Sequence, residues 1–166
     1  GSYLQSDFIE VLVDRNYEVH VFDANPNFYI IKNKKIIFHH IDFSLINNLE
    51  VKLKKIGVNY IFAPAGEKAN EIAAEMCDRL KLNYNSIITV NVCRSKKLQR
   101  LKLKQHKTFK PVKSFYASNK NNYNLSGFTF PVIVKPDNSS ASRGVSLVSS
   151  QIELPGAISN AFEFTS

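Results

Sequence analysis

Amphipathic stretches and short apolar runs alternate along the first half of the chain. Apolar residues recur at helical spacing in three stretches, which predict helices over residues 5–15, 44–56 and 66–82. Strand-like runs lie between them, over residues 17–23, 34–42 and 58–64, and a turn is predicted at Asn25-Pro26. Helices and strands that alternate with short connections indicate an open parallel α/β sheet. The strand that usually precedes the first helix of such a sheet is not found, and we expect it to lie outside this sequence.

Local signals mark the ends of these helices. Ser6 or Asp7 is suited to begin the first helix, because either side chain can accept a hydrogen bond from a free amide. Gly57 follows the second helix directly and is a favourable C-terminal residue. The third helix has one apolar face that we expect to be buried, formed by Ile72, Ala73, Met76 and Leu80.

The pattern changes after residue 92. A strongly basic helix is predicted over residues 95–107, ending before Lys110-Pro111, and a short strand and an Asn-rich loop follow it over residues 112–116 and 117–127. Two further strands, PVIVK and GVSLVSS, flank a polar loop. The tail has helical spacing, and Pro155 must either lie in the first turn of that helix or break it. We therefore predict two domains, residues 1–92 and residues 93–166.

The stretch FPVIVKPDNSSASRGVSLV, residues 130–148, combines a lysine at the end of a strand with a loop of small polar residues. Lys135 supplies a point charge, Arg143 supplies a five-donor fork, and Gly144 permits close approach of the backbone. Such a loop can turn amides and hydroxyls toward an anion, of which phosphate is the commonest. A plain hairpin with a polar surface loop is the alternative, and composition alone favours it.

The sequence KPDNSSASRGV resembles the nucleotide-binding hairpin of the ATP-grasp superfamily, which often reads K-P-x-x-S-S-G-S-x-G-V. Ala141 stands where the family usually has glycine. The matching positions are Lys135, Pro136, Ser139, Ser140, Ser142, Gly144 and Val145.

Two further segments extend the resemblance to nearly the whole chain. The segment SKKLQRLKLKQHKTFKP is similar to the family helix D-K-x-x-Q-K-x-x-L, with Ser95 in place of the acid. On that alignment Lys96 is the second ATP lysine, and Lys97 is the alternative register. The start GSYLQ and the stretch VHVFDANPN resemble the α/β domain of carbamoyl-phosphate-synthetase-like and purine-biosynthetic members, which carry G-x-x-Q and D-x-N-P.

The resemblance implies an open parallel-sheet pre-ATP-grasp domain followed by the first part, a small α+β subdomain, of an ATP-grasp module. It implies a ligase that uses ATP and Mg²⁺ to phosphorylate a small-molecule carboxylate, which an amine or similar nucleophile then attacks. Lys96 and Lys135 would hold the α- and β-phosphates, and residues 139–144 would fold over the triphosphate. The implied nucleotide-binding residues are Lys96, Lys135, Ser139, Ser140, Ser142, Arg143, Gly144 and Val145.

The family places its magnesium-binding acids and its catalytic arginine after this hairpin. We therefore expect the metal ligands to lie downstream of residue 166, and no catalytic or metal-binding residue is assigned within the chain. Residues 1–166 are expected to bind ATP without completing ligation alone. Glu163 is interpreted as a surface residue.

Charge brings in a rival function. The net charge of +8 and the isoelectric point near 9.5 suggest an anionic partner. Nucleic acid is the rival ligand, because the basic helix lies close to several aromatic residues. It is disfavoured, because the charges lie all round the helix instead of forming one stripe. A non-catalytic nucleotide-binding or assembly subunit is a third alternative, and a homo-oligomer is compatible with the sequence.

The remaining chemistry-bearing residues suggest structural roles. Cys77 and Cys93 are predicted to be reduced and mostly buried, because neither lies in a metal-spaced cluster. His39 and His40 are adjacent in a predicted strand and should point to opposite faces, so they are not expected to share one ion. No apolar run is long enough to cross a bilayer, so we expect a cytoplasmic protein without membrane contacts.

Overall fold

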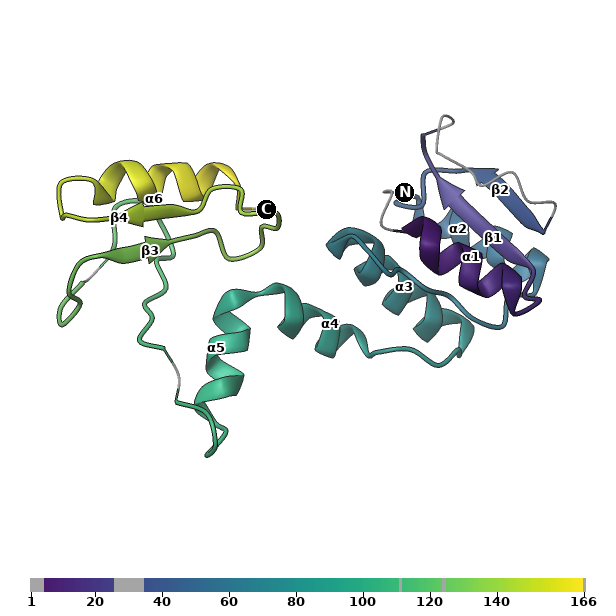
Figure 1. Cartoon of the computed structure of the whole chain (residues 1–166), viewed down its shortest axis with the longest axis horizontal. Helices are drawn as coiled ribbons and strands as arrows, with labels where there is room; N and C mark the ends of the chain where they lie inside the picture. Colours follow the sequence, from purple (N-terminus) through teal and green to yellow (C-terminus); the bar gives the residue numbers. More distant parts are fainter. Residues whose placement is uncertain (1–4, 26–34, 111, 124, 166) are drawn as a thin grey trace. The chain divides into compact units, whose positions relative to one another are not determined.

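The computed structural model divides into two compact units, residues 1–90 and residues 91–166 (Figure 1). It describes residues 5–25, 35–110, 112–123 and 125–165. Among these residues, no helix is both long and apolar enough to cross a membrane.

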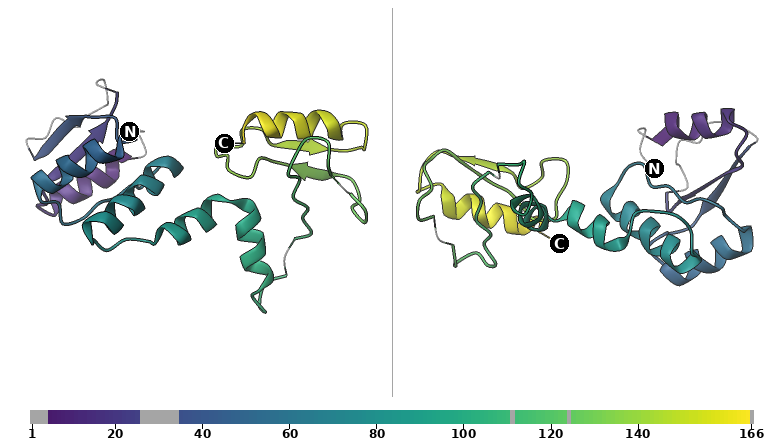
Figure 2. Two further views of the ribbon diagram at one scale, coloured as in Figure 1. Left: turned by 180° about the vertical axis from the view of Figure 1, so that it is seen from behind. Right: turned by 90° about the horizontal axis from the view of Figure 1, so that it is seen from below.

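The first unit is built around a short parallel sheet. Strands β1 (Val19–Asp23) and β2 (Ile36–His40) pair in register from Val19 opposite Ile36 to Asp23 opposite His40. Helices α1 (Ser6–Asp14) and α2 (Ile46–Ile56) cover opposite faces of this sheet, as the right-hand view of Figure 2 shows. The predicted open α/β architecture with a parallel sheet is therefore confirmed.

Alternation along β1 divides the core into two parts. Val19 and Val21 face α1, where they pack with Ile9 and Val13. Phe22 points to the opposite face, as expected for side chains that alternate along a strand. The core on that face is formed by Leu49, Leu53, Ile72 and Met76, from α2 and α3 (Glu67–Leu80).

Of the helix ends predicted from the sequence, the end of α2 is confirmed and the start of α1 is not. Gly57 closes α2 in the left-handed conformation, with its amide bonded to the carbonyl of Leu53, as predicted. The prediction that Ser6 or Asp7 caps α1 is wrong. Gln5 is the N-cap and makes no side-chain capping bond, because its side-chain amide donates to the carbonyl of Ala65 instead, at 3.2 Å.

The predicted strand over residues 58–64 is wrong. Val58 and Ile61 pack against the core formed by α2 and α3. Tyr60 and Phe62 are exposed instead, with Tyr60 against Tyr17 and Phe62 against Phe8. The side chains thus alternate as in a strand only over residues 60–62, and the described sheet contains only β1 and β2. Alternation reports which way side chains face, and a strand also needs a neighbouring backbone with which to pair.

The sequence analysis missed one helix, which runs across the boundary between the two units. Helix α4 (Ile87–Arg94) is rich in β-branched residues, which obscures its helical pattern. Ser86 begins it, because the Ser86 hydroxyl accepts a hydrogen bond from the amide of Thr89 at 3.2 Å. Helix α5 (Lys96–Lys104) follows after a break at Ser95 and is three residues shorter at its end than predicted.

A hairpin and a helix form the core of the second unit. Strands β3 (Val132–Val134) and β4 (Ser146–Val148) pair antiparallel, and α6 (Leu154–Glu163) packs along one face. Pro155 lies in the first turn of α6, which is one of the two predicted alternatives. The predicted strand over residues 112–116 is wrong, since those residues are exposed and pair with no described strand. Pro111 lies outside the described residues.

Two histidines stack across the sheet of the first unit. His39 lies on Phe22 and accepts or donates a hydrogen bond to His20, with 2.8 Å between Nε2 and Nδ1. His40 instead bonds the carbonyl of Ala24, on the other face. Partial burial, the charge of Lys52 and the neighbouring His20 lower the pKa of His39.

Acidification is expected to destabilise this unit. The folded chain holds a proton on His39 less readily than the unfolded chain, so protons favour unfolding once the pH falls below about 6.5. The free energy of unfolding from urea titrations should therefore decrease between about pH 7.5 and about 5.5. His39→Phe should flatten this dependence, whereas His106→Phe, at an exposed position, should leave it unchanged. Equal slopes in the two variants would contradict the assignment.

Candidate functional site

The hairpin places Lys135 at the end of an exposed apolar face. Ile133 and Leu147 stand opposite each other and are 57% and 64% exposed, because α6 packs on the other side of the hairpin. Side-chain alternation places Lys135 on the same face as Ile133, one step closer to the loop. The site therefore has an apolar floor that ends in a cation.

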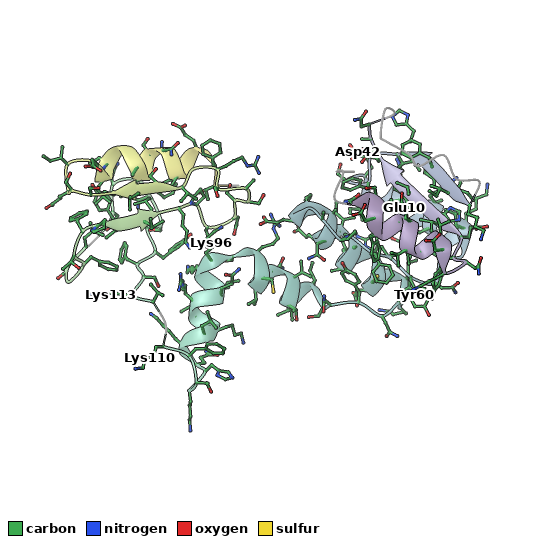
Figure 3. All side chains as sticks on the ribbon, in the orientation of Figure 1. Glu10, Asp42, Tyr60, Lys96, Lys110 and Lys113 are labelled. Carbon is green, nitrogen blue, oxygen red and sulfur yellow. The ribbon has the colours of Figure 1, made fainter. Side chains whose placement is uncertain are left out.

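Lys96 is held against the hairpin loop. Its Nζ donates to the carbonyl oxygens of Asp137 and Ser139, at 3.0 and 2.9 Å. An ammonium group has three donors, so one remains for a ligand. Figure 3 shows Lys96 at the end of α5 nearest the hairpin, with Lys110 beyond the opposite end. Lys97, the alternative register, lies over the ring of Tyr116 at 4.1 Å instead.

The carboxylate of Asp137 fastens the loop to the start of α5. Asp137 accepts hydrogen bonds from the hydroxyl of Ser95 at 2.8 Å and from the amide of Lys97 at 2.7 Å. Ser95 in turn caps the helix by accepting from the amide of Leu98 at 3.1 Å. A negative charge at a helix N-terminus is favourable, so this contact orients α5 toward the hairpin. The acid expected at position 95 is thus supplied from the loop.

Three cations converge where α5 meets the end of β3. Burial, then the charges of Arg100 and Lys96, lower the pKa of Lys135. Arg100 lies one helical turn after Lys96, on the same side of α5. Like charges held together in this way repel each other, and an anion between them would relieve the repulsion.

The loop between the strands folds through left-handed residues. Ala141 and Ser142 have φ values of 55° and 57°, and Gly144 has a φ of 69°. A left-handed alanine costs about 1 kcal/mol, so the replacement of the usual glycine adds strain without preventing the turn. Arg143 folds back over this turn, with its amide and its Nε both donating to the carbonyl of Ser140 at 3.3 Å.

Gly144 is buried between Pro136 and Phe164. A Cβ at this position would lie 2.8 Å from a side-chain carbon of each. The glycine is therefore required for packing at the base of the loop as well as for its positive φ.

One buried polar atom of the loop lacks a partner. The Oδ1 of Asn138 is shielded from solvent and accepts no hydrogen bond from any described residue. A buried acceptor is costly when it is unpaired, so a donor from a ligand or a water molecule would stabilise the loop.

The predicted site residues lie close together, at the start of α5 and on the β3–β4 hairpin. The bonds from the Asp137 carboxylate to Ser95 and Lys97 form a clamp between the loop and α5. Around this clamp lie Lys96, Lys135 and the loop residues 139–144, while Val145 continues the exposed apolar face. Sequence reasoning missed Asp137 and Arg100. The i, i+4 spacing of Arg100 from Lys96 was a usable signal, whereas no local pattern connects Asp137 with a helix that begins 41 residues earlier.

Other chemistry-bearing residues lie outside this site. Cys77 is buried, and burial raises its pKa, but Cys93 is exposed, so the prediction that both thiols are mostly buried is wrong for Cys93. A thiol on the outer side of a short helix has no core to enter. Glu163 is exposed, as predicted. Among the described residues, no three His, Cys, Asp or Glu side chains form a group suited to a metal ion.

The hairpin, Lys135 and nearly all of α5 lie in the part of the chain that a family model matches. Residues 97–166 match the family model described as D-ala D-ala ligase C-terminus, which belongs to the ATP-grasp superfamily. The resemblance found in the sequence is therefore confirmed for the ATP-grasp superfamily. The finer resemblance to carbamoyl-phosphate synthetases and purine enzymes stays a prediction.

The chain is also similar to two known ligases, in one case over a short segment and in the other in its fold. Over 45 residues it is 49% identical to the D-alanine–D-alanine ligase of Helicobacter pylori (strain Shi470), an alignment that covers 27% of this chain and 13% of that protein. The crystal structure of the L-amino acid ligase from Bacillus licheniformis superposes with a TM-score of 0.72 at 18% identity. That match covers 93% of this chain and 38% of the other, and it shows a shared fold. The chain thus spans well under half the length of either relative.

Substitution of two glycines should have opposite effects. Gly144→Ala should lower the free energy of unfolding by about 2 kcal/mol, because the added methyl overlaps Pro136 and Phe164. Gly156→Ala, in α6 and with no atom within 4 Å, should raise it by about 0.5 kcal/mol. Thermal and urea unfolding of both variants would check this, and a neutral Gly144→Ala would contradict the packing described.

Removal of the Asp137 carboxylate should release the start of α5. Asp137→Ala should lower the free energy of unfolding by about 1–2 kcal/mol, since two hydrogen bonds to the helix N-terminus are lost. Hydrogen exchange at the Lys97 amide should accelerate. As a control, Glu163→Ala removes an exposed acid from the same unit and should leave the Lys97 amide protected. Unchanged exchange in Asp137→Ala would contradict the bond between Asp137 and the start of α5.

Proposed function

We propose that this chain is the ATP-binding part of an ATP-dependent carboxylate–amine ligase that works through an acyl phosphate. The observation that carries the proposal is the convergence of Lys96 and Lys135 beside a phosphate-type loop. Lys135 and the loop lie within residues 97–166, which match a ligase family model, and Lys96 directly precedes that segment. Lysine charges held by the backbone can offset the charge of phosphates without large rearrangement. In this arrangement Lys96 and Lys135 contact the α- and β-phosphates.

The exposed face of the hairpin suits the base of the nucleotide. Ile133 and Leu147 present adjacent aliphatic side chains that nothing in the described second unit covers. An aromatic base laid on this face would bury apolar surface while its phosphates reached Lys135. The unpaired Oδ1 of Asn138 offers an acceptor for a donor of the bound molecule or of a bridging water.

The loop over residues 139–144 is suited to close over the phosphates. Its serines are small, its backbone turns through left-handed residues, and Gly144 fixes its base between Pro136 and Phe164. Successive amides of such a turn can face an anion, and closure would exclude water from the reacting phosphate. Ser139, Ser140, Ser142 and Arg143 are the loop donors in this proposal.

The remainder of the reaction is assigned outside these residues. Among the described residues, no three His, Cys, Asp or Glu side chains form a group that could hold a metal ion, and we propose no Mg²⁺ ligand among them. We propose residues 1–92 as the pre-ATP-grasp domain and residues 93–166 as the first part of the ATP-grasp module. The carboxylate and amine substrates then bind with the help of further parts of the complete enzyme.

Nucleotide binding can be separated from the rival, general binding of nucleic acid. The rival has one observation in its favour: residues 79–136 contain no acidic residue. A site made by Lys135 should bind ATP with little dependence on salt, whereas general polyanion binding should weaken steeply as salt is added.

Lys135→Ala should weaken ATP binding at least about tenfold, because one charged contact to a phosphate is lost. Lys107→Ala removes an exposed lysine beyond α5 and should leave ATP affinity unchanged. Isothermal titration calorimetry with ATP and with a single-stranded oligonucleotide measures both. Equal losses in the two variants, or steeply salt-dependent binding of the oligonucleotide in preference to ATP, would support the rival.

A further inference from the structure

Arg100 stands out among the cations of α5. Arg100 is partly buried, whereas every residue from 101 to 110 is exposed. It lies one turn after Lys96, whose Nζ is bonded to the hairpin loop, so the same side of the helix carries Arg100 toward the end of β3. The interaction between the charges of Arg100 and Lys135 agrees with this placement.

The guanidinium of Arg100 has no partner among the described residues. It makes no hydrogen bond and no ion pair with them, although it is partly withdrawn from water. Asp137 is the nearest acid along the loop, but its two carboxylate oxygens already bond Ser95 and Lys97. An arginine with a purely structural role would be expected to satisfy its five donors on carbonyls or carboxylates.

The surroundings of the cluster are strongly positive. Residues 91–166 contain 12 of the 22 lysines and arginines of the chain but only three of its 14 acids. Lys96, Arg100 and Lys135 therefore repel one another, and the neighbouring Asp137 carboxylate brings one negative charge against these three positive ones. One negative charge leaves most of this repulsion in place, whereas a ligand with several charges relieves it.

We propose that Arg100 is a third phosphate-binding residue, and that with Lys96 and Lys135 it makes the site selective for the polyphosphate chain of a nucleotide. The inference rests on the proposed function and adds a specificity that the two lysines alone do not provide. The planar fork of arginine can bind two oxygens of one phosphate, whereas each lysine offers a point charge. Nucleoside di- and triphosphates are bound, and the monophosphate is discriminated against.

The test compares the affinities of ATP, ADP, AMP and adenosine for the chain. Arg100→Gln should weaken ATP and ADP about tenfold or more, while the affinity of AMP changes little and that of adenosine not at all. Arg100→Lys should restore part of the preference for ATP, because it returns the charge without the fork. Lys104→Gln, one turn further along α5 and exposed, removes the same charge and should leave all four affinities unchanged.

The outcomes separate this inference from the function on which it rests. If ATP binds through Lys135 but Arg100→Gln keeps the preference of ATP over AMP, the role of Arg100 is overturned and the ATP site stands. If all four ligands weaken equally in both Arg100→Gln and Arg100→Lys, Arg100 only supports the fold. If unaltered protein binds none of them, the proposed function fails as well.

Discussion

The contact between Asp137 and the start of α5 is the constraint on which the candidate site depends. It brings the loop of the hairpin to a helix that begins 41 residues earlier. Lys96 lies on α5 and Lys135 at the end of β3, and this contact holds those two elements together. The carboxylate bonds one hydroxyl and one amide, and the backbone carbonyl of the same residue bonds Lys96. One residue thus fixes both the helix and its cation.

This arrangement holds positive charge together before any ligand arrives. The nearby acid Asp137 orients α5, and its one negative charge is too little to offset Lys96, Lys135 and Arg100 together. The loop is also strained locally, because Ala141 adopts a left-handed conformation that suits glycine better. Sites that bind or react often retain such local strain, because the surrounding structure keeps them in place. Here the packed hairpin and α6 provide that support.

Much of the first unit could be predicted because its signals are local. The faces of α1 and α3, the stop at Gly57 and the parallel pairing of β1 with β2 all follow from periodicity and turn chemistry. Residues 58–64 show the limit, since alternation does not reveal whether a neighbouring strand is available. Helix α4 was missed because its β-branched residues imitate a strand.

The site could be predicted where its residues belong to short sequence motifs. Lys135 and the loop were found from the sequence of the hairpin, and Lys96 from a second motif. Asp137 was passed over because its role depends on a long-range contact with Ser95, which no periodicity reports. Arg100 was seen as one of many basic residues, and only its burial and position on α5 distinguish it from the exposed lysines.

The central claim is that ATP binds between α5 and the hairpin loop. Backbone amide chemical shifts recorded by NMR during an ATP titration test it most directly. We expect saturable shifts concentrated at residues 95–100 and 133–147, with residues 101–110 nearly unaffected. Shifts spread over the exposed lysines of residues 101–110, with none in the loop over residues 139–144, would contradict it.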